Sequence, residues 1–239
     1  MITRGMRDPL AIAVAQPPCV SHDVAANAVT HAAAIRAADA RVVVFPELSL
    51  TGYELDTPAI AADDPRLSPM VEACAEAGAV ALAGAPARGA AGRPHLSLLA
   101  VDGTGATVAY HKMWLGGAEP ERFAPGGEPA VLEVDGWRLG LAVCKDTGVA
   151  RHAADTAALG IDAYVAAVAE HAEDAAVLGE RARRIATEHS VWVAVASFAG
   201  PTGGGYTRTA GCSGIWGPDG IVVAQAGPET GALTRAVLA

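Results

Sequence analysis

The stretch WRLGLAVCKDTG, residues 137–148, combines the features that decide the fold and the chemistry of this chain. Its first part is an apolar run that is typical of a buried β-strand. The run ends at Cys144, and Lys145, Asp146 and a turn follow directly. Core packing alone does not require a thiol, an ammonium group and a carboxylate at the end of one strand. These side chains therefore indicate a chemical role at this point of the fold.

The composition narrows the class of protein. The 239 residues are enough for a large hydrophobic core, and no linker, charge block or low-complexity tract divides them, so we expect a single domain over residues 1–239. The net charge of −9 disfavours nucleic acid or an anionic membrane as a partner, because phosphate binding needs clustered Lys and Arg. No apolar run is long enough to span a bilayer. The first one, residues 10–16, has the pattern of a strand rather than of a signal peptide.

Cysteine and histidine usage disfavours disulfides and bound metal. The four cysteines are scattered and form no CxxC pair, which predicts a reduced chain in the cytoplasm. The seven histidines are dispersed, without an HExxH motif, so we expect no metal site. The Gly-rich stretch 200–211 lacks the motifs of dinucleotide- and phosphate-binding loops, so we expect no cofactor. We interpret it as a flexible surface loop; a mobile loop beside a substrate pocket is the alternative.

Short apolar runs alternate with Ala-rich helical runs along the chain. Helices are expected over residues 22–39, 68–78, 149–159 and 174–189. Strands are expected over residues 10–16, 41–47, 79–86, 95–101, 106–112, 130–134, 137–144, 162–169, 191–198 and 211–217, and two short strands close the chain. Asp-Gly pairs between apolar runs predict hairpins in the middle. This order predicts an α/β domain in which helices cover mixed sheets.

Three reactive side chains lie where predicted strands end. Glu47 closes residues 41–47, Lys112 closes residues 106–112, and Cys144 closes the opening stretch. Ligands of α/β proteins bind at the carboxyl ends of strands. Each residue also has an ordinary interpretation, because a charge at a strand end is usually solvated and a lone buried cysteine is usually inert. The spacing alone does not bring the three together.

The sequences around these residues resemble the signature of the nitrilase or carbon–nitrogen hydrolase superfamily. The matching stretches are VVVFPELSLTGYE (42–54), YHKMWLGG (110–117) and GLAVCKD (140–146), in the family's order. Residues 121–140, 178–200 and 211–227 are similar to further family segments, so the resemblance covers nearly the whole chain. It implies the family fold, a four-layer α-β-β-α sandwich of mixed β-sheets with helices on the outer faces. That fold agrees with the element order read above.

The resemblance also implies catalytic roles. Cys144 corresponds to the nucleophile, Glu47 to the general base, and Lys112 to the cation that stabilises the thiolate and the oxyanion. These residue types suit the chemistry, because an amide carbonyl is a poor electrophile and a free thiol is mostly protonated at neutral pH. Family members often carry a second glutamate that orients the lysine. Glu119 stands at its position, whereas Glu121 is expected to face solvent.

Three further residues are expected to contact substrate. They are Tyr53, His171 and Lys145. The backbone N–H of Lys145 is also expected to be the second oxyanion donor. The Lys145 side chain has two interpretations: it pairs with a structural carboxylate such as Asp146, or it reaches the pocket and favours a substrate that bears a carboxylate.

We therefore expect a hydrolase that cleaves a non-peptide C–N bond of a small amide or carbamoyl compound through a cysteine thioester. The alternatives are an acyltransferase on the same scaffold and a non-catalytic family member that binds a ligand. The resemblance favours amides over nitriles. It also implies a homodimer or larger homo-oligomer, although the chain ends at residues 231–239 without the family's usual C-terminal tail.

Overall fold

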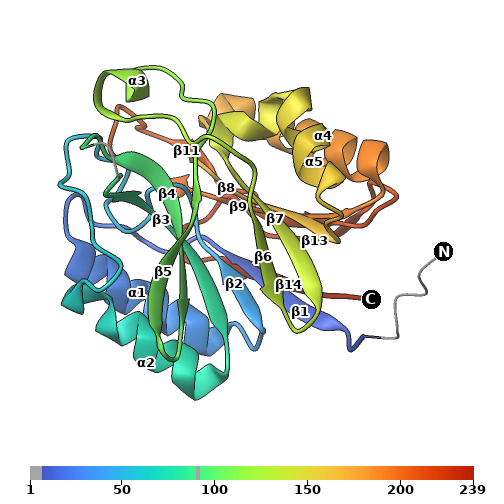
Figure 1. Cartoon of the computed structure of the whole chain (residues 1–239), viewed down its shortest axis with the longest axis horizontal. Helices are drawn as coiled ribbons and strands as arrows, with labels where there is room; N and C mark the ends of the chain where they lie inside the picture. Colours follow the sequence, from blue (N-terminus) through green and yellow to red (C-terminus); the bar gives the residue numbers. More distant parts are fainter. Residues whose placement is uncertain (1–6, 90–91) are drawn as a thin grey trace.

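The computed structural model in Figure 1 describes residues 7–89 and 92–239. The predicted domain, residues 1–239, therefore includes residues 1–6 and 90–91, which lie outside the described part. Two six-stranded mixed sheets lie face to face, and helices cover their outer faces. The expected α-β-β-α sandwich is confirmed.

The first sheet has the strand order β14-β1-β2-β3-β4-β5. Strands β1, β2 and β3 are parallel, whereas β14, β4 and β5 pair antiparallel with their neighbours. Side chains alternate along β1: Ile12 and Val14 face the second sheet, and Ala13 and Ala15 face the helices. The elements are β1 (Leu10–Ala15), β2 (Val42–Val44), β3 (Val80–Ala87), β4 (His95–Asp102), β5 (Gly105–His111) and β14 (Leu233–Leu238), with α1 (Val24–Ala37) and α2 (Ser68–Ala77) outside.

The second sheet has the order β13-β12-β9-β8-β7-β6, in which β7, β8 and β9 are parallel. Its strands are β6 (Val131–Val134), β7 (Trp137–Val143), β8 (Ala163–Val168), β9 (Trp192–Ser197), β12 (Gly214–Trp216) and β13 (Val222–Gln225), and its helices are α4 (Ala150–Ala158) and α5 (Ala175–His189). The smaller elements are α3 (Glu119–Arg122), a strand pair of β10 (Ala199–Gly200) and β11 (Thr209–Ala210), and 3-10 turns at Pro65–Leu67, Cys144–Gly148 and Ala172–Asp174.

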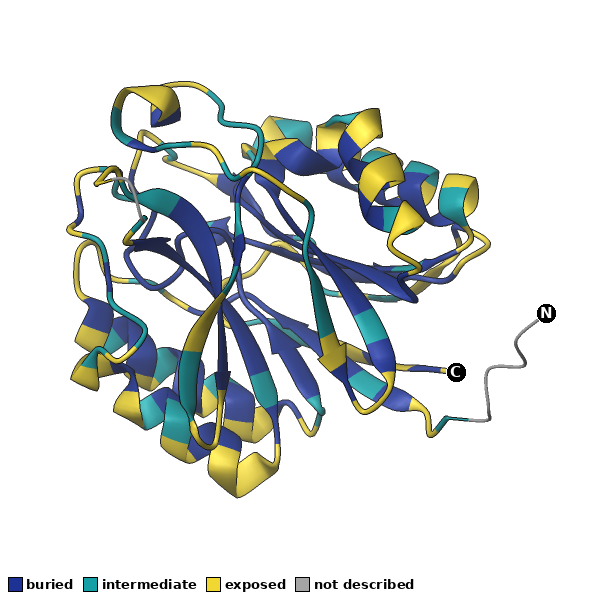
Figure 2. Ribbon diagram, in the orientation of Figure 1, coloured by how far each residue is buried: buried dark blue, intermediate teal, exposed yellow. Residues whose placement is uncertain are grey.

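The main core lies between the two sheets. Figure 2 shows the strands buried in the middle of the molecule and the helices exposed only on their outer sides. Trp137, Trp216, Tyr164 and Phe45 are among the largest fully buried side chains. Burying each apolar side chain of this kind contributes about 1.5–3 kcal/mol, so the sandwich is a rigid support for the strand ends.

Two strands are shorter than expected, and both differences concern reactive residues. The expected strand 41–47 is ordered only as Val42–Val44, because Pro46 has no N–H for the ladder. Glu47 therefore lies in the turn that follows β2. The expected strand 137–144 ends at Val143, and Cys144 opens the 3-10 turn Cys144–Gly148 with a φ of 43°. A non-glycine residue seldom adopts this left-handed conformation.

Gly84 of β3 allows the Glu47 turn to pack tightly against the sheet. A Cβ atom at this position would lie 2.2 Å from Leu48 N and 2.6 Å from Pro46 O. We expect Gly84→Ala to lower the free energy of unfolding by about 1–3 kcal/mol, as overpacking does, and to reduce the activity that depends on Glu47. Urea denaturation measures the first effect. Gly127→Ala is the control, because a Cβ there meets nothing within 4 Å; equal losses in both variants would contradict the prediction.

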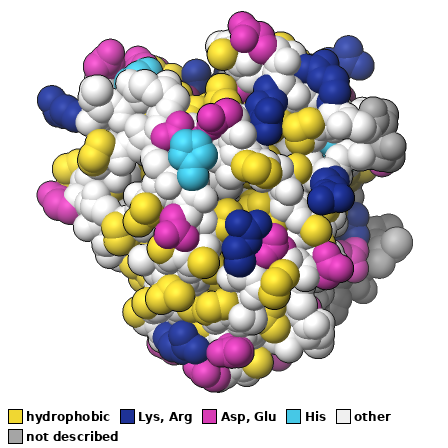
Figure 3. All heavy atoms as spheres, turned by 90° about the vertical axis from the view of Figure 1, so that its left-hand side faces the viewer, with side chains coloured by type: hydrophobic (Ala, Val, Ile, Leu, Met, Phe, Trp, Pro, Cys, Tyr) yellow, Lys and Arg dark blue, Asp and Glu magenta, His cyan; other side chains and the backbone are white. Residues whose placement is uncertain are grey.

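The surface is mixed in character. On the face shown in Figure 3, acidic and basic side chains are interspersed with apolar ones. None of the helices within residues 7–89 and 92–239 has both the length and the apolar character needed to cross a membrane.

Candidate active site

The candidate site forms where strand ends from both sheets meet. Strand β5 runs in the same direction as β2 and β3, because β4 is antiparallel to both β3 and β5. The carboxyl ends of β2 and β5 therefore lie at the same end of the first sheet, and Glu47 and Lys112 follow these strand ends. Cys144 follows β7 of the second sheet. The structure brings all three into one buried cluster, in which Glu47 and Lys112 are each 1% exposed and Cys144 is 9% exposed.

Lys112 is the centre of this cluster. Its Nζ donates to Glu47 Oε1 and to Glu119 Oε1, each at 2.7 Å. Burial alone would lower the pKa of Lys112, but the two carboxylates and the Cys144 thiol outweigh it and raise the pKa. Lys112 is therefore held as an ammonium ion in a dry site, where its charge acts most strongly.

Glu119 rather than Glu121 faces the lysine. Besides Lys112, the Glu119 carboxylate accepts hydrogen bonds from Tyr53 Oη at 2.9 Å and from Gly116 N at 2.8 Å. Glu119 is 4% exposed, whereas Glu121 lies on the exposed side of α3. The structure therefore places Glu119, and not Glu121, at Lys112, and Tyr53 enters the site by donating to Glu119.

Glu47 has the properties of a base that works near neutral pH. Burial raises the pKa of Glu47 to about 7, the Lys112 charge opposes this shift, and Glu119 adds to it. Its Oε2 has no hydrogen-bond partner of normal geometry among the described residues. The nearby Cys144 thiol also affects this pKa. Glu47 therefore has a free oxygen with which to accept a proton beside the thiol.

The Cys144 thiol is held in a fixed place. Its Sγ donates to Ala169 O at 3.5 Å, and Thr147 Oγ1 donates to Cys144 O at 2.7 Å. Burial and the Glu47 carboxylate raise the pKa of this thiol, while Lys112 opposes them. The resting form is therefore a neutral thiol next to a base, and it needs proton transfer to become a nucleophile.

Asp146 fastens the Cys144 turn to the lysine segment. Its carboxylate accepts from Val143 N at 2.9 Å, from Trp114 N at 2.9 Å and from Tyr110 Oη at 2.8 Å. Tyr110 and Trp114 flank the end of β5, so one buried carboxylate ties the two sheets together at the site. The opening stretch thus contains a structural acid as well as a thiol.

Two expected substrate contacts lie outside the buried cluster. The Lys145 ammonium is exposed and donates to Leu115 O at 2.6 Å, not to Asp146. The structure therefore does not show the expected pairing of Lys145 with Asp146, whose oxygens are already occupied. His171 is exposed and stacks on the Tyr206 ring at 4.3 Å between centroids.

The Gly-rich loop 200–211 lies on the surface beside the site and packs against it at several points. Gly203 N donates to Gly52 O at 2.8 Å, and Tyr206 Oη donates to Ala169 O at 3.2 Å. The Tyr206 ring also meets the Tyr53 ring edge-on at 4.9 Å. Much of the loop is exposed, so it is a surface loop that also lies against the site. Tyr206 was missed, although it is an aromatic residue in a loop of small residues.

One group of side chains within the described residues has the spacing of metal ligands. His22, Glu54 and Asp56 each bring a ligand atom within 4.8 Å of the others. His22 Nε2 lies 2.8 Å from Asp56 Oδ1, and Ser21 Oγ donates to Glu54 Oε1 at 2.7 Å. These surface side chains already bond one another and their neighbours, and we assign no metal to them.

The architecture and the position of the cysteine define the class of protein. Two mixed sheets face to face, with helices outside and a thiol at the carboxyl end of the parallel strand β7, form the nitrilase-like α/β fold. The chain belongs to the carbon-nitrogen hydrolase family, whose model matches residues 11–238. This membership makes it a hydrolase of the nitrilase superfamily and confirms the resemblance found in the sequence.

Individual relatives agree with this assignment. A protein of Pseudomonas protegens described as "Hydrolase in pqqF 5'region" is 30% identical over 225 residues, which cover 90% of this chain and 78% of the relative. The amidase of Nesterenkonia sp. AN1 superposes with a TM-score of 0.85 at 25% identity, over 96% of this chain and 93% of that one. A cysteine-to-alanine mutant of that amidase in complex with butyramide has the same TM-score and identity, and covers 96% of this chain and 90% of that one.

Proposed function

We propose that the protein hydrolyses a small amide or carbamoyl compound through a thioester on Cys144. The observation that carries this proposal is the buried Lys112 ammonium, bonded to both Glu47 and Glu119, next to a thiol that has a base beside it. A structural core needs no such group, because buried ion pairs cost desolvation energy and add little stability. The similar amidase that binds butyramide supports a small amide as the substrate.

The first half of the reaction forms the thioester. Glu47 takes the thiol proton while Sγ of Cys144 bonds to the carbonyl carbon, and the carbonyl electron pair moves to oxygen. The Lys112 ammonium and the N–H of Lys145 stabilise this oxyanion. When the oxyanion collapses, the C–N bond breaks and Glu47 gives its proton to the leaving ammonia or amine.

The second half returns the enzyme to its resting form. Glu47 takes a proton from water, and the hydroxide adds to the thioester carbon. The C–S bond then breaks with its electron pair on sulfur, and Glu47 returns the proton to this thiolate as the acid product leaves. Tyr53 supports Glu119 in this scheme, and His171 and Lys145 lie at the rim, where we propose that they contact substrate.

Release of ammonia from purified protein tests the proposal. Small ω-amides, carbamoyl amines and nitriles form the panel, and Cys144→Ala is the control. We expect turnover of at least one amide or carbamoyl compound and none by the variant. Product transfer to an added amine in preference to water would instead indicate an acyltransferase, and no turnover across the panel would favour a ligand-binding protein.

The two glutamates of the α3 loop give a matched pair of variants. Glu119→Gln removes one carboxylate from Lys112 and should lower kcat/KM about 10- to 150-fold, because a buried hydrogen bond to a charged group contributes about 1.5–3 kcal/mol. Glu121→Gln changes an exposed side chain two positions away and should leave kcat/KM within about twofold. Steady-state kinetics with the best substrate decides; greater sensitivity at Glu121 would contradict the assignment.

We also propose a homodimer or larger homo-oligomer. Ile221, Val222, Val223 and Val237 are exposed on or next to β13 and β14, the neighbouring edge strands of the two sheets. Exposed apolar edge strands favour association. Light scattering at micromolar concentration should show an assembly that Val223→Lys weakens and that Val29→Lys, on the exposed side of α1, leaves intact. A monomeric wild-type protein would contradict this proposal.

A further inference from the structure

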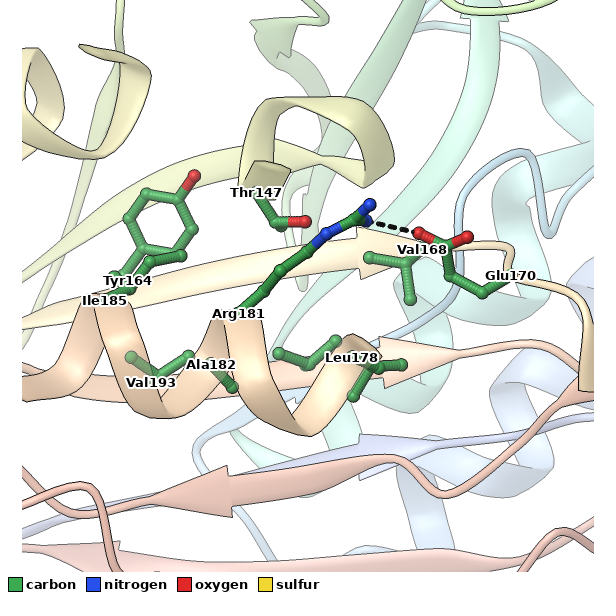
Figure 4. A pocket seen from close by; sticks show the side chains of 10 residues that line it. Thr147, Tyr164, Val168, Glu170, Leu178, Arg181, Ala182, Ile185 and Val193 are labelled. Atoms are coloured by element: carbon green, nitrogen blue, oxygen red, sulfur yellow. Dashed lines mark hydrogen bonds and ion pairs between the residues drawn. The ribbon is translucent and has the colours of Figure 1, made fainter. Parts of the chain in front are cut away.

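Helix α5 lies directly behind the Cys144 turn and reaches it with two arginines. Arg184 Nη2 donates to Thr147 O at 2.8 Å, and Thr147 in turn holds Cys144 O. Arg181 stands one turn earlier on the same face of the helix. Figure 4 shows its side chain extending from α5 past Thr147 to Glu170, across a small cavity between the helix and β8.

Arg181 forms an ion pair with an acid next to the thiol's hydrogen-bond partner. Its Nη1 lies 2.5 Å from Glu170 Oε1, and the two side chains are only 29% and 16% exposed. Glu170 directly follows Ala169, whose carbonyl oxygen accepts from Cys144 Sγ. The guanidinium also lies close to the Cys144 turn, because a Cβ at Gly148 would be in van der Waals contact with it at 3.4 Å. The fold thus places the Glu170 carboxylate next to the hydrogen-bond partner of the thiol, and the Arg181 guanidinium forms an ion pair with this carboxylate.

The charges around the thiol show why this pair matters. On the first-sheet side, one cation, Lys112, is bonded to two carboxylates, Glu47 and Glu119. The Tyr206 hydroxyl donates to the same Ala169 carbonyl as the thiol, and the Tyr53 hydroxyl donates to Glu119; neither supplies a positive charge. Glu170 is a further carboxylate from the second-sheet side, and after burial and Glu47 it also raises the pKa of Cys144. Without a partner, it would oppose a thiolate in a weakly screened site.

We propose that Arg181 is a positioning residue of the reaction, which holds and neutralises Glu170 so that the charge of this carboxylate does not oppose formation of the Cys144 thiolate. The inference rests on the proposed role of Cys144 as the nucleophile. It extends that role to α5, whose Arg181 touches neither substrate nor thiol. The pair acts through Glu170 alone, so the effect of losing the arginine depends on the presence of that acid.

The rate of Cys144 alkylation by iodoacetamide as a function of pH tests this directly. Peptide mass spectrometry follows the modified cysteine, and no substrate is needed. Arg181→Gln leaves Glu170 unpaired and should raise the apparent thiol pKa by about one unit, which slows alkylation near neutral pH about 10-fold. Glu170→Gln should not slow it, and the double variant Arg181→Gln/Glu170→Gln should return to within about twofold of wild type. Arg181→Lys should keep most of the reactivity.

The controls separate charge from structure. Arg183→Gln removes an equal charge from the exposed side of α5 and should leave the pH profile unchanged. If Glu170→Gln and the double variant are as slow as Arg181→Gln, the pair only tethers the helix and the proposal is overturned. Thermal unfolding shows whether each variant is folded. If Arg181→Gln is not folded, the alkylation rate of the double variant still tests the proposal. A shifted alkylation profile without any amide turnover would overturn the proposed function but support this inference.

Discussion

Cys144→Ala is expected to abolish turnover, with a loss of at least about 10⁴-fold in kcat, as for the removal of other enzyme nucleophiles. In the wild-type protein, one equivalent of an alkylating reagent should label Cys144 first. The fraction of activity lost should equal the fraction of Cys144 that is labelled. The physical reason is the surroundings of Cys144: among the described residues, it is the cysteine on which both Glu47 and the Lys112 ammonium act. Proton transfer to Glu47 makes the thiolate without a free hydroxide.

The other three cysteines serve as internal controls. Burial raises the pKa of Cys19 to about 12 and that of Cys74 to about 11, and it also raises the pKa of Cys212. Burial is the sole cause for Cys19, whereas the carboxylates of Asp102 and Glu229 add to the upward shift of Cys74 and Cys212. These three thiols are therefore disfavoured as thiolates, and Lys112 is not among the groups that act on them. Cys74→Ala should therefore retain activity. Preferential labelling of Cys19, Cys74 or Cys212, or full activity in Cys144→Ala, would contradict the assignment.

Local patterns in the sequence were enough to predict an α/β domain in which helices cover mixed sheets, and the family resemblance implied the four-layer sandwich. Short runs that are apolar throughout indicate strands covered on both faces, and the Asp-Gly pairs between such runs indicate hairpins. The loop position of Glu119 also followed from sequence resemblance. The exact place of Glu47 did not, because a proline two residues after the last paired position ends β2 early. Which backbone atoms pair depends on neighbouring strands, and these are distant in sequence.

The partners of each site residue were harder to predict than the residues themselves. Asp146 meets Tyr110 across 36 positions, and Arg181 meets Glu170 across the end of β8. Periodicity identifies the face of an element that is buried, but not the side chain that it meets there. Tyr206 illustrates the same limit, because the glycines around it allow a close approach to Tyr53 that only the folded chain defines: a Cβ at Gly204 would lie 2.8 Å from the Tyr53 ring.

Glu47→Gln should lower kcat/KM by roughly 10²–10⁴-fold, the usual contribution of a general base. Glutamine keeps the shape of the side chain and can still accept a hydrogen bond from Lys112, but it cannot take the thiol proton. The sign of the pH dependence follows from the same group. Because the pKa of Glu47 is raised to about 7, the base is protonated and inactive at acid pH, so wild-type kcat/KM should rise with pH through about pH 7. This apparent value belongs to the coupled Glu47–Cys144 pair.

The pH profile of Glu47→Gln distinguishes a lost base from a damaged fold. The rising limb near pH 7 should disappear in this variant, whereas Cys144 should still react with iodoacetamide at alkaline pH, where hydroxide removes the thiol proton. Glutamine also removes a negative charge that opposes the thiolate, so alkylation at high pH should be at least as fast as in wild type. Gly84→Ala, which displaces the same turn by steric contact, should instead lose stability and turnover while it keeps the limb. A Glu47→Gln enzyme that retains both the limb and the wild-type rate would exclude Glu47 as the base.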